Sequence, residues 1–501
     1  MDSPIVSSAE MRAAEQAAFA RGIAVESLMD QAGAGLARAI EKFFPAPGTC
    51  AVFAGKGHNG GDALVAARWL QRRGWKIDLH LAFPEGDCSE LTRKKLQELT
   101  TDPVPSATDN RGGHLIVLDG LLGVGAKPQL REPIRSAVQE INRQRREQNA
   151  FVFAVDLPTG LNSDSGNLSP EECVKADFTV TIGFAKRGLV ADSAIDFVGR
   201  LEVVPLPALI LTGVSPNEIV AIPESLGQLL PRRPFSAYKN LFGRIGVVAG
   251  SEGFLGAAIL ATKGALRGGA GLVNMFVPRS LYSTVAALAP DEAMVKPIES
   301  YTDVLNENNV DVWAVGPGLG TSRADEILEV IEHADKPMVV DADGLNILSK
   351  KIDVLNRCQG PRLLTPHPGE MKRLFDAGKL PRAQIARKFC DEFPVSLLFK
   401  GSRTIVCERN RPISYNSTGN PAMATGGIGD VLTGICAALL GQKLAPYDAA
   451  RLGSWLCGRA AEMGVFQQNQ SEQSLLPRDI IDHMGIAFND LRSSWSNSTH
   501  E

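Results

Sequence analysis

Short apolar runs alternate with longer amphipathic segments through the first 200 residues, and this pattern constrains the fold more than any other feature. Four of the runs have the length and composition of buried strands: residues 50–54, 76–81, 114–119 and 151–156. The segments between them, such as 63–73 and 132–148, have the composition of helices. Strands and helices in alternation are typical of an open, doubly wound α/β sheet, which we predict for this part of the chain.

A second series of the same kind follows a stretch rich in proline between residues 205 and 234. Its predicted strands and late helices are residues 244–249, 311–315, 337–340, 362–365 and 395–400, then 429–440 and 446–466. Since 501 residues exceed what one hydrophobic core organises, we expect two domains. Their predicted bounds are 8–212 and 224–490, with 213–223 as the linker.

Composition excludes several classes of function. The net charge of −4 provides no basic surface that would attract nucleic acid or an anionic membrane. No apolar stretch approaches the roughly 20 residues that span a bilayer, and the N-terminus has no signal-peptide pattern. The eight cysteines are scattered without metal-ligand spacing, which argues against a zinc or disulfide framework. We therefore expect a cytoplasmic protein that acts on small molecules.

In the first half, polar residues follow three of the predicted strands. The segments are 55–62 (GKGHNGGD), 119–125 (DGLLGVG) and 156–160 (DLPTG). Ligands of open α/β sheets bind at the carboxyl ends of strands, and the free N–H groups of a helix N-terminus bind phosphate. Any one of these segments could be an ordinary tight turn. Three together, each with an acid or amide, indicate a ligand site.

These three segments resemble the epimerase domain of the NAD(P)H-hydrate repair enzymes, over about residues 8–212. The resemblance implies a Rossmann-like three-layer α/β/α fold and a potassium ion bound by Asn59, Asp119 and Thr159, whose oxygen atoms suit such a cation. It implies Asp156 as a substrate contact, which makes it our candidate catalytic acid or base. The remaining implied substrate contacts lie in two loops: His58, Asn59, Gly60, Gly61 and Asp62, then Gly123, Val124, Gly125, Ala126, Lys127, Pro128 and Gln129.

In the second half, residues 419–430 (GNPAMATGGIGD) precede an apolar helix. Consecutive glycines at a helix start leave N–H groups that can hold a transferring phosphoryl group. An aspartate at that position, Asp430, can accept the proton of an attacking hydroxyl. The alternative is a simple glycine-rich helix start, but the GxGD arrangement with a helix behind it favours phosphate chemistry.

Together with 268–273, 316–320, 341–346, 365–371 (TPHPGEM) and 400–404, this segment resembles the ribokinase-like NAD(P)H-hydrate dehydratases, over about residues 224–490. The resemblance implies a ribokinase-like α/β domain, ADP as phosphoryl donor with a magnesium ion, and a homo-oligomer. It implies that Ala257, Gly318, His367 and Asp430 contact the hydrated nucleotide. It implies that Lys400, Gly401, Ser402, Arg403, Thr404 and Gly429 contact the adenine nucleotide.

The two resemblances fit one function. Hydration of the nicotinamide ring gives two epimers, and phosphorylating the new hydroxyl makes it a good leaving group, so that elimination restores NADH or NADPH and leaves AMP and phosphate. An epimerase fused to a dehydratase that takes only the S form clears both epimers. Two alternatives stay open: a ribokinase-like small-molecule kinase, and an N-terminal domain that only senses a dinucleotide without catalysis.

Overall fold

The computed structural model describes residues 2–103, 113–125, 129–211, 216–468 and 470–498, and the chain divides into two compact units. One unit comprises residues 3–216 and the other residues 217–501 with the first two residues. The boundary between 216 and 217 lies inside the segment 213–223 that we predicted to be a linker. None of the helices in the described part of the chain is long and apolar enough to cross a membrane.

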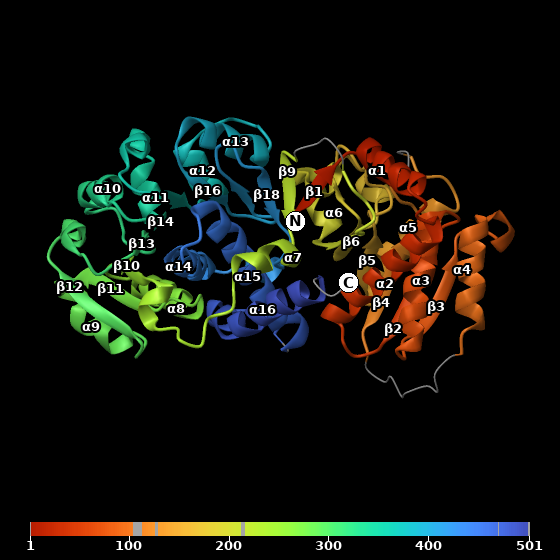
Figure 1. The fold of residues 1–501 in the computed structure, drawn as a ribbon, viewed down its shortest axis with the longest axis horizontal. Helices are drawn as coiled ribbons and strands as arrows, with labels where there is room; N and C mark the ends of the chain where they lie inside the picture. Colours follow the sequence, from red (N-terminus) through yellow and green to blue (C-terminus); the bar gives the residue numbers. More distant parts are fainter. Residues whose placement is uncertain (1, 104–112, 126–128, 212–215, 469, 499–501) are drawn as a thin grey trace. The chain divides into compact units, whose positions relative to one another are not determined.

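The N-terminal unit is built on a six-stranded sheet in which every pair of neighbours is parallel, in the order β3-β2-β4-β5-β6-β8 (Figure 1). The strands of the whole unit are β1 (Ser3–Val6), β2 (Thr49–Ala54), β3 (Lys76–Leu81), β4 (Leu115–Gly120), β5 (Phe151–Val155), β6 (Phe178–Ile182), β7 (Ala185–Lys186) and β8 (Arg200–Val204). Strands β1 and β7 lie outside the six-stranded sheet and pair with each other in parallel. Its helices are α1 (Ser8–Ala20), α2 (Val25–Phe43), α3 (His58–Arg72), α4 (Glu90–Thr101), α5 (Ile134–Glu147) and α6 (Ile195–Val198). The predicted doubly wound α/β class is confirmed.

The four predicted strands form the first part of this sheet, within one or two residues of their expected bounds. Sequence analysis missed β6 and β8, which complete it. Strand β6 is a short run that alternates threonine with apolar residues, and all five of its residues are buried because Thr179 and Thr181 bond inside the unit. Polar residues in a fully buried strand hide it from a search for apolar runs.

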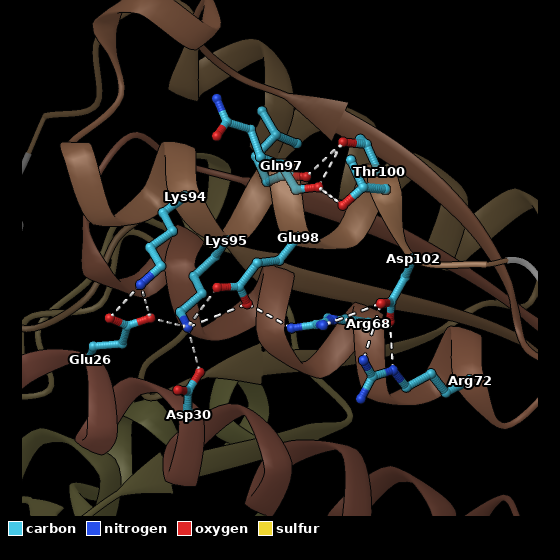
Figure 2. A network of polar contacts seen from close by, with 12 residues as sticks. Glu26, Asp30, Arg68, Arg72, Lys94, Lys95, Gln97, Glu98, Thr100 and Asp102 are labelled. Carbon is cyan, nitrogen blue, oxygen red and sulfur yellow. Dashed lines mark hydrogen bonds and ion pairs between the residues drawn. The ribbon is translucent and has the colours of Figure 1, made fainter.

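Ion pairs, rather than a broad apolar face, connect helix α4 to helices α2 and α3. The buried Lys95 ammonium lies 2.7 Å from Glu26 and 2.8 Å from Asp30, both on α2 (Figure 2). On α3, Arg68 pairs with Glu98 at 2.6 Å and with Asp102 at 2.9 Å. This network holds α3, whose N-terminus carries the first candidate loop, between two other helices.

The C-terminal unit contains a longer sheet, in the order β12-β11-β10-β13-β14-β15-β16-β17-β18-β9. Its strands are β9 (Glu218–Ala221), β10 (Arg244–Val248), β11 (Leu272–Pro278), β12 (Ala293–Ile298), β13 (Val312–Val315), β14 (Met338–Val340), β15 (Arg362–Leu364), β16 (Ser396–Phe399), β17 (Ile405–Cys407) and β18 (Ile413–Asn416). Only β17 runs antiparallel to its neighbours among these described strands. The other pairs are parallel.

The helices of this unit are α7 (Pro223–Leu226), α8 (Leu255–Arg267), α9 (Tyr282–Leu288), α10 (Ala324–His333), α11 (Asp343–Leu348), α12 (Pro368–Leu374), α13 (Arg382–Glu392), α14 (Ile428–Gly441), α15 (Pro446–Gln467) and α16 (Pro477–Ser498). Helices α8, α14, α15 and α16 share one hydrophobic core with the sheet. In Figure 1, α8 and α14 lie side by side, and they pack so closely that a Cβ on Gly434 would lie 2.0 Å from the Ala261 carbonyl oxygen.

All five predicted strands and both predicted helices of this half are present. Part of the predicted linker is not a linker: residues 218–221 form β9, which pairs in parallel with β18. A strand of four residues in a proline-rich stretch is too short to be recognised from its sequence pattern. Its pairing partner lies almost 200 residues further along the chain. Only the tertiary structure reveals such a pairing.

The division into units predicts that the two halves fold separately. A chain cut between residues 216 and 217, which leaves β9 with its partner, should give two folded pieces, each with one cooperative unfolding transition. Circular dichroism during thermal unfolding measures this. A cut after residue 223, which removes β9 from the second piece, is the matched control and should lower its melting temperature. Equal melting temperatures for both C-terminal pieces would contradict a structural role for β9.

Candidate functional sites

In the N-terminal unit, the three predicted loops follow β2, β4 and β5, which are neighbours in the sheet. Their carboxyl ends therefore lie at one edge, and the Gly55 N–H donates to the Gly120 carbonyl oxygen at 3.0 Å. The first loop leads into α3, whose N-terminus has no side-chain cap. Helix α4 holds this loop from outside, since the Thr92 hydroxyl donates to the Gly57 carbonyl oxygen at 3.0 Å. The structure thus brings the three segments together.

The three residues of the predicted potassium site lie around one short loop. The Thr159 hydroxyl and N–H donate to the two oxygens of Asp119, at 2.7 and 2.8 Å. The Leu122 N–H donates to the Thr159 hydroxyl at 3.2 Å, and a Cβ on Gly123 would lie 3.3 Å from Asn59 Oδ1. Residues 121–123 therefore connect the carboxylate, the hydroxyl and the amide.

These residues fit a monovalent cation because of one buried charge. Asp119 is completely buried and pairs with no cationic side chain within the described parts of the chain. Burial raises its pKa to about 6, although bonds from Thr159 and Leu121 oppose the shift. A buried carboxylate without a counter-charge, close to the oxygens of Thr159 and Asn59, is what an oxygen-coordinated cation would complete.

Asp156 lies in a different environment. Its φ of 67° places it in the left-handed region, which is uncommon for a residue other than glycine and occurs often at functional sites. One carboxylate oxygen accepts from the Ile182 N–H at 3.0 Å and from the Thr181 hydroxyl at 3.2 Å, and it pairs with the ammonium of Lys186. Asp156 is thus held in place by Lys186 and by the end of β6.

Lys186 is the residue of this site that sequence reasoning missed. Its side chain is fully buried, and besides Asp156 it donates to Thr181 Oγ1 at 3.2 Å and to the Ile182 carbonyl oxygen at 2.9 Å. Lysine is almost never fully buried without a partner. The sequence feature that could have identified Lys186 is its position at the end of residues 178–186 (FTVTIGFAK), shortly after a strand.

Two further carboxyl groups share this electrostatic environment. Burial first, and then the charges of Asp156 and Glu15, raise the pKa of Asp62 well above its usual value. Burial also raises the pKa of the half-buried Glu15, against the opposing charge of Lys186. Three carboxyl groups near one ammonium disfavour ionisation of all three, and the raised pKa of Asp62 favours its protonated form.

The remaining predicted substrate contacts fall into two groups: residues packed closely against their neighbours, and residues with open space or solvent around them. A Cβ on Gly60 would lie 2.0 Å from the Gly55 carbonyl oxygen, so close backbone packing requires this glycine. A Cβ on Gly61 would lie 2.5 Å from Met29 Cε, the end of a flexible side chain. Gly125 has open space around it and His58 is exposed. Val124 and Gln129 flank the rest of the second loop; Ala126, Lys127 and Pro128 lie outside the described residues.

In the C-terminal unit, the loops after β13, β14, β15 and β16 meet at one edge because these strands are consecutive in the sheet. Asp341, just after β14, is buried and accepts from Lys400 Nζ at 2.6 Å and from the Thr433 hydroxyl at 2.7 Å. Lys400 Nζ also lies 3.8 Å from Glu370. Burial alone would lower the pKa of Lys400, but Asp341 and Glu370 outweigh burial and raise it. Sequence analysis quoted Asp341 in a motif without giving it a role.

Asp430 lies in the first turn of α14, which follows the N-cap residue Gly427 with its φ of 95°. Burial, followed by the charge of Asp341, raises the pKa of Asp430 to about 7. A Cβ on the neighbouring Gly429 would lie 3.3 Å from Lys400 Nζ and 3.6 Å from Asp341 Oδ2. A group with pKa near 7 at a glycine-rich helix start is suited to accept a proton close to a bound phosphoryl group.

His367 has a structural role that sequence reasoning did not identify. Its Nδ1 accepts from the Gly369 N–H at 3.0 Å, and Glu370 accepts from the His367 N–H at 2.8 Å, which together form a capping box at the start of α12. The other side of the ring stays accessible, since half of the side chain is exposed. Through Glu370, this cap is connected to Lys400.

Ala257 and Gly318 are close neighbours, since a Cβ on Gly318 would lie 3.0 Å from Ala257 Cβ. In the loop after β16, Gly401 and Arg403 have φ of 150° and 57°. Arg382 donates to the Ser402 carbonyl oxygen at 2.8 Å, and the Thr404 hydroxyl donates to the Gly401 carbonyl oxygen at 3.1 Å. Lys400 differs from the rest of this loop, because its ammonium is directed to Asp341.

Comparison with known proteins assigns each half. Residues 25–188 match the family described as YjeF-related protein N-terminus, and residues 245–484 match the family described as NAD(P)H-hydrate dehydratase. A protein of Moorella thermoacetica named bifunctional NAD(P)H-hydrate repair enzyme is 36% identical over 93% of this chain and 92% of its own length. The chain belongs to the bifunctional NAD(P)H-hydrate repair enzymes.

Another relative agrees with this assignment. A protein of the same name from Gloeobacter violaceus is 36% identical, over 92% of this chain and 95% of its own. As a family member, this chain is an NAD(P)H-hydrate epimerase fused to an NAD(P)H-hydrate dehydratase. Among solved structures, the chain is similar to an ADP/ATP-dependent NAD(P)H-hydrate dehydratase of Bacillus subtilis, co-crystallised with ATP and magnesium, at 27% identity. That similarity covers 54% of this chain and 98% of the other, with a TM-score of 0.48.

Proposed function

We propose that this chain repairs hydrated NADH and NADPH in two steps, with Asp156 and Asp62 acting in epimerisation and Asp430 acting in ADP-dependent dehydration. The observation that supports this most strongly is the contrast between the two halves. The N-terminal site contains Asp156 paired with a buried ammonium and Asp62, whose pKa is raised. The C-terminal site contains a carboxyl group of pKa about 7 beside a glycine-rich helix start.

In the dehydratase half, Asp430 removes the proton of the hydrate's hydroxyl group as its oxygen attacks the terminal phosphorus of ADP. The N–H groups of Gly427 and Gly429 hold the phosphoryl group in transfer. Transfer breaks the bond to the leaving phosphate oxygen and releases AMP. Elimination then breaks the carbon–oxygen bond and expels phosphate, the neighbouring ring carbon loses a proton to water, and the electrons of that C–H bond restore the ring double bond. Lys400, held by Asp341 next to Gly429, supplies positive charge near the phosphates.

In the epimerase half, the hydroxyl group is attached to the carbon next to the ring nitrogen, because water adds to an enamine at that carbon. Loss of this hydroxyl as water needs a proton, which Asp62 provides, and leaves a cationic ring that the Asp156 carboxylate stabilises. Water then adds to the opposite face and returns a proton to Asp62. The carbon–oxygen bond broken on one face is re-formed on the other, so the net result is epimerisation.

Potassium in the N-terminal site would be held by the Asn59 amide, the Asp119 carboxylate and the Thr159 hydroxyl, and it supplies a fixed positive charge for the anionic substrate. These oxygens carry one charge, which suits a monovalent ion better than magnesium. A magnesium ion with the ADP, a homo-oligomeric state and a cytoplasmic location are expectations from the resemblance. Light scattering of the purified chain tests the oligomer.

The substitution Asp119→Ala tests the cation site. We expect it to weaken hydrate binding and slow epimerisation, because the buried charge that holds the cation is lost, while ADP-dependent dehydration of pure S-hydrate continues. Replacement of potassium by a bulky organic cation should cause the same defect in the unmodified chain. Epimer interconversion followed by chromatography measures both. Full epimerisation without potassium would contradict the site.

The overall function is tested by incubating the separated hydrate epimers with the chain, potassium and ADP or ATP. Return of the reduced-nicotinamide absorbance from both epimers supports repair. A stable phosphate ester without that absorbance would instead identify a small-molecule kinase. Binding of hydrate with no interconversion of epimers would leave the N-terminal half as a dinucleotide sensor.

A further inference from the structure

A cavity in the C-terminal unit lies apart from the candidate dehydratase site and is rich in arginine. Its volume is about 630 Å³, which falls in the range of small-molecule sites. Helices α8 and α14 begin at the dehydratase site, with Ala257 and Asp430 in their first turns, and end at this cavity with Arg267 and Gln442. A helix of 13 residues is about 20 Å long, so the cavity and the dehydratase site are separate.

The lining of the cavity combines positive charge with apolar walls. Among the described residues, the wall contains four arginines, Arg232, Arg233, Arg267 and Arg492, and a single carboxylate, Asp482. The apolar part includes leucines of the segment before β10 together with Phe242, Ile486 and Phe488. This concentration of positive charge is local, since the chain as a whole has a net charge of −4.

One of these arginines, Arg492, has a buried N–H without a partner, and the exposed Arg233 lies within its electrostatic reach. Arg492 Nε is buried and has no hydrogen-bond acceptor among the residues that the structure describes. Burial, and then the charge of Arg492, lower the pKa of Arg233, so the two guanidinium groups repel each other. Neither forms an ion pair within the described chain. Buried polar groups are nearly always satisfied, and such an exception indicates a ligand or ion.

Arg233 has a second role that Arg492 does not share. It donates to the Gly269 carbonyl oxygen at 2.7 Å, just beyond the end of α8, and its guanidinium lies 3.6 Å from the centre of the Phe242 ring. Arg233 thus has a fixed, stacked position in the cavity wall, and a planar guanidinium of this kind suits phosphate. Among the described residues, Arg492 has no such bond to lose, while Arg233 has one.

We propose that this cavity is a second binding site, for a phosphate-bearing small molecule with a planar ring, that is, a nucleotide. Arg233 and Arg492 bind the phosphate, and the apolar wall around Phe242 and Phe488 receives the ring. The dehydratase site differs from this one, because there the N–H groups of consecutive glycines and Lys400 surround the phosphates. The proposal does not depend on the roles assigned to Asp430 or Asp156.

The test uses AMP, adenosine and inorganic phosphate on the full chain and on Arg492→Gln, with Arg146→Gln as the control. Arg146 is an exposed arginine of α5 in the other unit, so its variant has the same net charge. Hydrogen exchange should show that AMP protects residues 266–271 and 485–492 in the unmodified chain. In Arg492→Gln, the AMP concentration for half-maximal protection should rise about tenfold to a hundredfold, as expected when a charged hydrogen bond is lost.

The control variant should match the unmodified chain, and adenosine and phosphate alone should each protect more weakly than AMP. Thermal stability separates a binding role from a structural one, because Arg492→Gln removes an unpaired cation and should not lower the melting temperature. Four results would overturn the proposal: no protection by AMP, equal affinity in Arg492→Gln and Arg146→Gln, phosphate binding as tight as AMP, or a lower melting temperature for Arg492→Gln without AMP.

Discussion

Asp430→Asn should lower the rate of S-hydrate dehydration by about 10²–10⁴-fold, the usual contribution of a general base. Asparagine keeps the size of the side chain at the start of α14 but cannot accept the proton of the hydroxyl group. Epimerisation should be unchanged, because the groups proposed for it lie in the other unit. Single-turnover assays with pure S-hydrate and ADP measure the loss.

The raised pKa of Asp430 determines the pH profile. A base must be ionised, so with a pKa of about 7 the dehydration rate should rise as pH increases through 7 and level off above it. The Asn variant should lack this rise.

Because burial disfavours the charged form, Asp430→Asn should unfold at the same or a higher temperature than the unmodified chain at pH 8. Dehydration at the normal rate, or a loss explained by unfolding, would contradict the role of Asp430 as base.

Lys186→Met should destabilise the N-terminal unit by about 3–5 kcal/mol and abolish epimerisation. Removing one partner of a buried ion pair leaves the other charge uncompensated, which costs about this much. Here the lysine is fully buried and the Asp156 side chain is 12% exposed. Urea unfolding of the residue 3–216 piece measures the stability. In the full chain, dehydration of pure S-hydrate should continue, which distinguishes this defect from general misfolding.

Two further variants complete this test. Lys94→Met breaks an exposed pair with Glu26 on the surface of the same unit and should cost at most about 1 kcal/mol. Lys186→Met combined with Asp156→Asn leaves no buried charge at that pair and should recover much of the stability, but not epimerisation. If the single and double variants were equally unstable, the effect would come from packing and not from the charge of Asp156.

The sequence alone determined the class of each half and the segments that form the sites. Alternating apolar runs and amphipathic segments predict a parallel α/β sheet, and the rule that ligands bind at the carboxyl ends of its strands singled out segments 55–62, 119–125 and 156–160. Within them, the family resemblance pointed to Asn59, Asp119 and Asp156. The GxGD segment likewise identified Asp430. These features are local in sequence, since each is a strand followed directly by its loop.

Only the tertiary structure decided which charges meet. Lys186 pairs with Asp156 across 30 residues, Lys400 with Asp341 across 59, and β9 with β18 across almost 200. The pKa of a carboxyl group depends on burial and on neighbours brought close by the fold, so nothing in the sequence around Asp62 or Asp430 reveals that their pKa values are raised. The arginine cavity likewise could not be predicted from the sequence. Its wall combines segments more than 200 residues apart, which come together only when α8, α14 and α16 pack.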